Sequence, residues 1–95
     1  QSLPTAYNLF QNYPNPFNPS TKIKYSIKQE SHVRLIVYDA LGREAATIVN
    51  QHQLRNNYEV KFETNNTFSS GIYFYVLYAG DHVSVRKMVL TKWIF

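Results

Sequence analysis

Alternation of apolar and polar residues is the feature that most limits what this chain can form. In the segment 22–28, Lys-Ile-Lys-Tyr-Ser-Ile-Lys, Ile and Tyr side chains fall at every second position, and segment 58–63 repeats the pattern. Successive side chains of a β-strand point to opposite faces, so each segment predicts a strand with one face in solvent and one in a core. A helix would not gather these positions on one side, because its period is close to 3.6 residues.

Five further segments also predict strands. Residues 82–90 alternate and then change phase near Arg86 and Lys87, which predicts a β-bulge at that point. The run 72–78 is dense enough in apolar residues for a central strand, and we expect Phe74 to be buried. Seven strands that each bury one face predict an all-β, immunoglobulin-like antiparallel sandwich. The predicted strands are 7–11, 22–28, 33–38, 46–49, 58–63, 72–78 and 82–90.

Turn-forming residues separate these segments. Asp-Ala-Leu-Gly at 39–42 predicts a type I turn followed by a glycine bulge. The asparagine pairs at 56–57 and 65–66 and the Ala-Gly-Asp at 79–81 predict further turns. Residues 51–55 show no clear pattern.

The segment 13–19, Tyr-Pro-Asn-Pro-Phe-Asn-Pro, differs from the rest of the chain. It holds three of the four prolines, each of which lacks an N–H group and fixes φ. A central strand is therefore excluded, and we predict a stiff connector that lays Tyr13 and Phe17 over one end of the sandwich. A stiff connector is also a rigid epitope, because a partner binds it at little cost in conformational entropy.

Composition narrows the function. Ninety-five residues make one domain, 1–95, and the absence of cysteine excludes disulfides, thiolate metal sites and a cysteine nucleophile. The net charge of +4 would suit an anionic partner. However, Lys22, Lys24 and Lys28 on one strand are better explained as a solvated face that discourages edge pairing, so no nucleic-acid partner is predicted.

No catalytic or metal site is predicted either. The histidines His32, His52 and His82 have no sequence neighbours that complete a recognisable site. Glu59 and Glu63 share the polar face of one strand, but a domain this small offers no deep cleft for a glycosidase pair. We therefore expect no enzyme activity, no metal and no cofactor.

Four stretches of the chain together resemble a known family. The string Pro-Asn-Pro-Phe-Asn-Pro-Ser-Thr at 14–21 is the most distinctive of them. Over nearly the whole chain the order of these motifs resembles the C-terminal sorting domains of the type IX secretion system. A related immunoglobulin-like domain occurs in flagellar hook-capping proteins. The four stretches are 7–21, 33–43, 70–75 with its Gly-x-Tyr, and the lysine-bounded 87–92.

The resemblance implies a non-catalytic C-terminal module of a larger secreted protein. It implies that an outer-membrane type IX translocon reads the folded domain from the periplasm, that an N-terminal cargo domain travels with it to the cell surface, and that a sortase-like cysteine peptidase removes it. For Gly71, a turn residue with unusual φ is the simpler explanation. The positions that the resemblance marks for recognition are Pro14, Asn15, Pro16, Gly71, Tyr73, Lys87 and Lys92.

An alternative function remains open at this stage. Tyr73 and Tyr75 lie on the same side of one strand, and exposed rings in such a row suit a carbohydrate. Trp93 is a further candidate ring. The alternative is thus an accessory carbohydrate-binding or spacer module of a secreted enzyme, although packing in the core or at an edge is the more ordinary place for the two tyrosines.

The two ends of the chain carry a further expectation. Because the chain begins with Gln1 rather than Met, we expect a processed or excised piece of a longer protein. At the other end, Trp93, Ile94 and Phe95 extend past the last lysine of the motif. We expect these three residues to complete the last strand, to pack on a neighbouring module or to pair with another copy.

Overall fold

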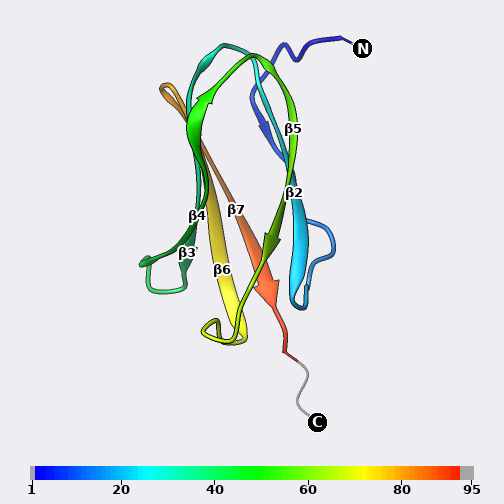
Figure 1. Ribbon diagram of the computed structural model, residues 1–95, viewed down its shortest axis with the longest axis vertical. Helices are drawn as coiled ribbons and strands as arrows, with labels where there is room; N and C mark the ends of the chain where they lie inside the picture. The colour runs from blue at the N-terminus through cyan, green and yellow to red at the C-terminus, as the bar shows by residue number, and fades with distance from the viewer. Residues whose placement is uncertain (1, 93–95) are drawn as a thin grey trace.

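Two antiparallel sheets that face each other make up the computed structural model, which describes residues 2–92 (Figure 1). The described residues contain no helix, and so none that could cross a membrane. The expectation for Trp93, Ile94 and Phe95 lies outside the described residues. The strands are β1 (Asn8–Leu9), β2 (Ser20–Ile27), β3 (Ser31–Asp39), β4 (Glu44–Gln53), β5 (Asn56–Glu63), β6 (Gly71–Ala79) and β7 (His82–Leu90).

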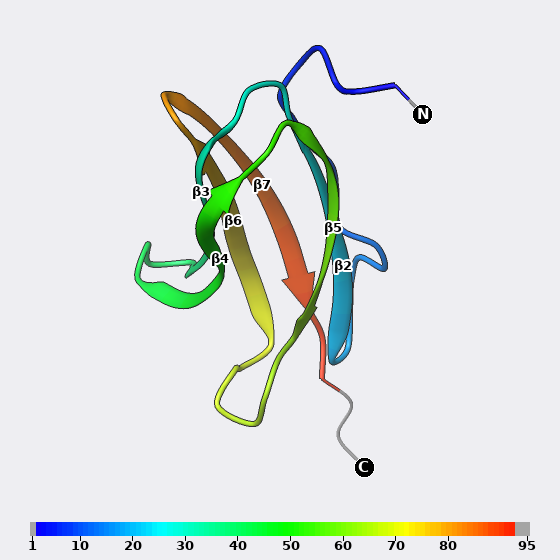
Figure 2. The same ribbon diagram turned by 45° about the horizontal axis from the view of Figure 1, so that its top comes forward.

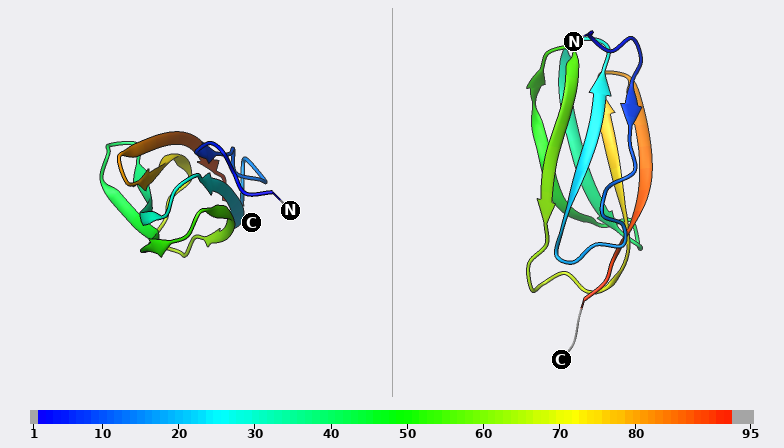
Figure 3. Two further views of the ribbon diagram at one scale, coloured as in Figure 1. Left: turned by 90° about the horizontal axis from the view of Figure 1, so that it is seen from above. Right: turned by 90° about the vertical axis from the view of Figure 1, so that its right-hand side faces the viewer.

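The strand order confirms the predicted all-β sandwich and adds its topology. One sheet has the order β1-β2-β5 and the other β4-β3-β6-β7. The fourth strand pairs with β3, whereas in a constant-type immunoglobulin domain the fourth strand pairs with the fifth. As a result β4 and β5 are edge strands on one side of the molecule, while β1 lies beside β7 on the other (Figure 3).

The core lies between the sheets and follows the alternation of the strands. On β6 the inward residues include the tyrosines Tyr73 and Tyr75, which confirms core packing for them. The expectation that Phe74 is buried in the core is wrong, because it points outward opposite Lys87 of β7 and is half-buried. Both faces of β6 carry apolar side chains, so alternation alone could not show which face turns inward.

The predicted bulge near Arg86 is also wrong, since β7 pairs with β6 in an unbroken register along its whole length. The phase change has a different cause. The inward face of the first half of β7 lies against the β1 segment, where polar groups find partners. His82 stacks on Tyr7 with ring centroids 4.4 Å apart, and Arg86 Nε donates to the Leu9 carbonyl at 2.8 Å.

The second strand of the β3–β4 hairpin is longer than predicted. β4 runs from Glu44 to Gln53, well beyond the predicted 46–49, and its pairing with β3 contains two register shifts. Its polar, irregular sequence is typical of an edge strand. The predicted turn at 56–57 is wrong because these asparagines begin β5; the chain reverses at Leu54 and Arg55 instead.

The other predicted turns are confirmed. At the 39–42 turn, the Gly42 N–H donates to the Asp39 carbonyl at 2.9 Å. Gly42 has φ +83°, a left-handed conformation that favours glycine, as the predicted glycine bulge requires. The turns at 65–66 and 79–81 are also present.

The proline segment 13–19 places its two aromatic residues differently. Phe17 is buried, with 1% of its surface exposed, and its ring centroid lies 6.1 Å from that of Phe62 on β5. Tyr13 is 81% exposed. The prediction is thus confirmed for Phe17 and wrong for Tyr13.

This difference predicts unequal effects on stability. Phe17→Ala should lower the free energy of unfolding by about 3–5 kcal/mol, because it removes a buried ring. Tyr13→Ala is the matched control and should change it by less than about 0.5 kcal/mol. Urea denaturation of both variants measures the effect, and equal losses would contradict the placement of Phe17 in the core.

Candidate functional site

The proline segment runs along the outer edge of β7 near the end of the sandwich where β7 finishes (Figure 3, right). Figure 2 shows the same segment as the blue loop beside β2. The Phe17 N–H donates to the Val89 carbonyl, and the Thr91 N–H donates to the Phe17 carbonyl, both at 3.0 Å. These bonds form a short parallel bridge between Phe17 and Leu90. Residues some 70 positions apart in sequence are therefore joined at one place.

We call this contact between the proline segment and the end of β7 the seam. Two amide side chains extend it at positions where prolines cannot form backbone hydrogen bonds. Asn15 Oδ1 accepts a hydrogen bond from the Val89 N–H at 3.0 Å, and Gln11 Nε2 donates to the Lys87 carbonyl at 2.7 Å. Prolines have no N–H to offer a neighbouring strand, so side-chain amides replace the missing backbone partners. Pro14 and Pro16 are exposed on the outside of the seam. The peptide bonds before Pro14, Pro16 and Pro19 are cis.

A buried polar network holds the segment from behind. Asn12 is 2% exposed, and its Nδ2 donates to Thr21 Oγ1 and to the Pro14 carbonyl, both at 3.1 Å. The Tyr75 hydroxyl accepts from the Asn12 N–H at 2.8 Å and donates to the Phe10 carbonyl at 2.7 Å. The network thus joins β6 to the connector between β1 and β2.

Sequence reasoning missed Asn12 and Tyr75 as residues that support the site. One signal was available: a tyrosine in a core strand needs a hydrogen-bond partner for its hydroxyl. Nothing in the sequence identified that partner as the backbone of the connector. Burial raises the pKa of Tyr75 to about 12, although the Asn12 N–H and the charge of Arg86 act in the opposite direction.

Gly71 and Tyr73 lie at the start of β6, beside the end of β7. Gly71 pairs with Leu90 and has φ +148°, which explains the glycine by backbone conformation. Tyr73 is 7% exposed and its hydroxyl donates to the Ser69 carbonyl at 2.8 Å. Its ring also packs near Phe68, with centroids 5.6 Å apart. Tyr73 therefore fixes the loop before β6 and presents no open ring to a sugar.

The two lysines of the motif occupy different surfaces. Lys87 is exposed on the outward face of β7 and forms no ion pair with any described residue. Lys92 lies past the end of β7, where its N–H donates to Ser70 Oγ at 3.0 Å and its Nζ lies 3.5 Å from the Asn66 carbonyl. Lys92 thus contacts the loop before β6, whereas Lys87 lies within β7, away from that loop.

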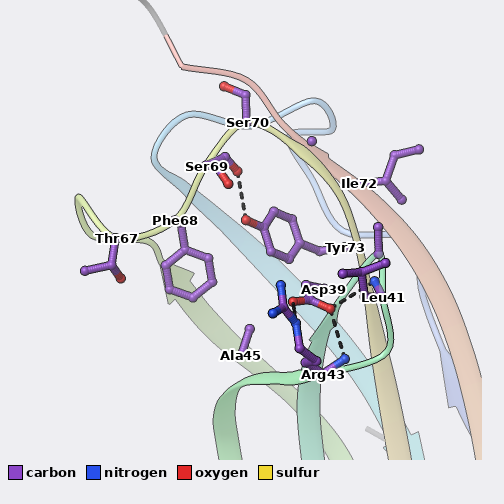
Figure 4. A pocket seen from close by; sticks show the side chains of 12 residues that line it. Asp39, Leu41, Arg43, Ala45, Thr67, Phe68, Ser69, Ser70, Ile72 and Tyr73 are labelled. Atoms are coloured by element: carbon purple, nitrogen blue, oxygen red, sulfur yellow. Dashed lines mark hydrogen bonds and ion pairs between the residues drawn. The ribbon is translucent and has the colours of Figure 1, made fainter.

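An open pocket of about 440 Å³ adjoins this end of the sandwich (Figure 4). Its walls are the 39–43 turn and the loop 67–71. The Asp39 carboxylate accepts from the backbone N–H groups of Arg43 and Leu41 and from Arg43 Nε at 2.8 Å. These contacts, the Arg43 N–H first among them, hold the pKa of Asp39 below its usual value. The one carboxylate among the described lining residues is thus already paired.

The other titratable candidates are paired at the surface. Glu59 lies between Lys22 and Lys24, with nitrogen–oxygen distances of 3.6 and 3.8 Å, and Glu63 lies 3.6 Å from Lys61. Among residues 2–92 no three His, Asp or Glu side chains come together as metal ligands. His32, His52 and His82 bind Asn50, Glu30 and Ser84 respectively.

The geometry describes a small β-sandwich whose distinctive motifs meet at a surface seam. A family model described as "Secretion system C-terminal sorting domain" matches residues 11–91. This is most of the chain, which therefore belongs to the family of C-terminal sorting domains of the type IX secretion system. Neither the curated proteins nor the solved structures contain a match.

The Tyr75 network generates a stability prediction. Tyr75→Phe should cost about 1–3 kcal/mol of unfolding free energy, because it leaves the buried Asn12 N–H and the Phe10 carbonyl without a partner. Tyr73→Phe is the matched control and should cost less, since water can reach the Ser69 carbonyl in its exposed loop. Thermal and urea unfolding of both variants measure the difference, and a neutral Tyr75→Phe would refute the network.

The raised pKa of Tyr75 generates a separate prediction for alkaline pH. In the unfolded chain the phenol ionises near its ordinary pKa of about 10, whereas in the folded chain it keeps its proton to about 12. The unfolded state loses its proton first, so rising pH favours unfolding between these values. The wild type should lose on the order of 1 kcal/mol per pH unit more than Tyr75→Phe there. Urea titrations from pH 9 to 12 measure the unfolding free energy of both proteins. Equal slopes of that free energy against pH would contradict the raised pKa of Tyr75.

Proposed function

We propose that this chain is a non-catalytic C-terminal module that directs a larger N-terminal cargo through the type IX secretion system to the outer membrane or cell surface. The family match supports a sorting role. On this proposal the partners are the outer-membrane translocon, which reads the folded domain from the periplasm, and a sortase-like cysteine peptidase.

The observation that carries the proposal is the meeting of separate motifs at one end of a stable domain. Asn15 contacts Val89, Phe17 pairs with Leu90, and Lys92 binds the loop before Gly71. A receptor would thus meet a surface that is already ordered and would bind it without ordering a flexible tail. We propose Pro14, Pro16 and the two lysines as its direct contacts, because their side chains are accessible.

Three other members of the motif have an indirect role in this proposal. Tyr73 holds the loop 67–71, Gly71 provides the backbone conformation at its end, and Asn15 attaches the proline segment to β7. Their substitution would move the exposed contacts rather than remove one. The carbohydrate-binding alternative has no comparable support, since Tyr73 and Tyr75 face the core.

The lysines separate recognition from folding. Replacing both Lys87 and Lys92 by Ala should leave the melting temperature within a few degrees, because exposed charged groups contribute at most about 1 kcal/mol. In the full-length protein the same change should leave the cargo in the periplasm. Cell fractionation with an antibody against the cargo measures this.

Two controls define the outcome. Tyr13→Ala alters an exposed residue of the proline segment that makes no side-chain hydrogen bond among those described, and it tests whether any surface change there blocks export. Deletion of residues 71–95 should abolish export. Normal surface delivery after that deletion would refute the sorting function, whereas normal delivery by the double lysine variant would only remove the two lysines from the contacts.

A further inference from the structure

The outward face of β6 and β7 is almost entirely apolar. Its residues alternate with inward-facing residues on both strands and pair across the ladder, for example Val76 with Val85 and Phe74 with Lys87. Lys87 is the one charged residue among them. The β6–β7 face consists of Ile72, Phe74, Val76, Tyr78, Val83, Val85, Lys87 and Val89.

Three apolar residues of this face are open to solvent. The exposed fractions of Ile72, Val83 and Val85 are 44%, 56% and 57%. Contiguous apolar surface of this kind on a small domain marks an interaction site, because each Å² left in water forgoes about 25 cal/mol of hydrophobic stabilisation. The outward face of the other sheet carries ion pairs instead, formed by Lys22, Lys24 and Glu59 and by Lys61 and Glu63.

On the side of β3, polar groups flank the buried Ile36, which pairs with Val76. The hydroxyls of Tyr38 and Tyr78 are 2.9 Å apart, and the Arg34 guanidinium lies over the Tyr78 ring at 4.3 Å from its centroid. Val76, in the middle of the face, is only 7% exposed. An apolar centre with a hydrogen-bonding rim is the usual anatomy of a protein–protein interface.

The charges on the face limit what can bind there. Lys87 in its centre has no ion pair among the described residues, and Arg34 at its rim adds a second positive charge. A second copy docked face to face would bring two positively charged faces together. A partner with a carboxylate opposite Lys87 would have the complementary charge.

We propose that the β6–β7 face docks a protein of the export machinery that presents an apolar surface with a carboxylate facing Lys87. The proposal rests on the sorting function and specifies how the domain is held. A protein is favoured over a membrane, because an apolar centre beside hydrogen-bonding groups is the anatomy of a protein–protein interface.

The apolar contact is tested by Val83→Thr combined with Val85→Thr in the full-length protein. Threonine keeps the branched shape that suits a strand, so the melting temperature should change little. Export of the cargo in the native host should fall at least tenfold at equal cellular amounts. The control is Leu54→Thr, which changes an apolar residue 63% exposed between β4 and β5, and its export should equal that of the wild type.

The charge is tested by Lys87→Glu against Lys61→Glu, which reverses the charge of another exposed strand residue on the other sheet. Lys87→Glu should abolish export, Lys87→Arg should retain it, and Lys61→Glu should export normally. Equal export by the two charge-reversed variants would refute the carboxylate partner.

Failure of this proposal can be distinguished from failure of the sorting function. If deletion of residues 71–95 blocks export but the double threonine variant exports normally, the docking face alone is wrong. Two measurements on the purified chain test the other occupants. A dimer in sedimentation that the threonines dissociate would favour a second copy, and threonine-sensitive flotation with phosphatidylethanolamine–phosphatidylglycerol vesicles would favour a membrane; either result would overturn the proposal.

Discussion

The seam between the proline segment and the end of β7 is the contact on which the rest of the molecule depends. The segment joins β1 to β2 in one sheet, and β7 is the last strand of the other. The backbone bonds from Phe17 to Val89 and Thr91 therefore link the two sheets through the backbone as well as through the core. They also cover polar groups at an edge that would otherwise be open to pairing with another chain.

The same seam depends on side chains that replace missing backbone partners. The proline segment cannot pair with β7 as a regular strand, because its prolines lack the N–H groups that a ladder of backbone hydrogen bonds needs. The amides of Asn15 and Gln11 supply contacts at two places along β7, and the buried Asn12 fixes the turn of the chain behind them. The exposed prolines are thus presented in a defined position, which a receptor needs if it is to recognise shape rather than charge alone.

Sequence predicted the sandwich because most strands have one wet and one buried face. The alternation in β2 and β5 predicted the bounds of both strands to within two residues, and Asp39 with Gly42 predicted a turn. Prediction failed in strands that do not have one wet and one buried face. Phe74 lies in a strand with apolar residues on both faces, and the apparent bulge near Arg86 arises because β7 faces polar groups of β1 over half its length.

The candidate site shows a similar limit. The sequence shows the proline string and Lys87, but not that they lie near each other. Their proximity depends on the pairing of Phe17 with Leu90, which come from opposite ends of the chain. Tyr73 was marked by its motif, but only the fold shows that its ring supports a loop. No local pattern carries such information, because the contacts that matter are between segments far apart in sequence.

β7 combines three roles that its alternating side chains and its edge keep apart. Its inward residues Met88 and Leu90 belong to the core, and its outer edge accepts the proline segment through Val89. Its outward side chains, with Lys87 among valines, remain free of both. A change at the Lys87 side chain therefore leaves the core and the seam in place, whereas a change at Leu90 would disturb both. The alternation and the edge position of a single strand thus divide the core, the seam and the outward face among different groups of atoms.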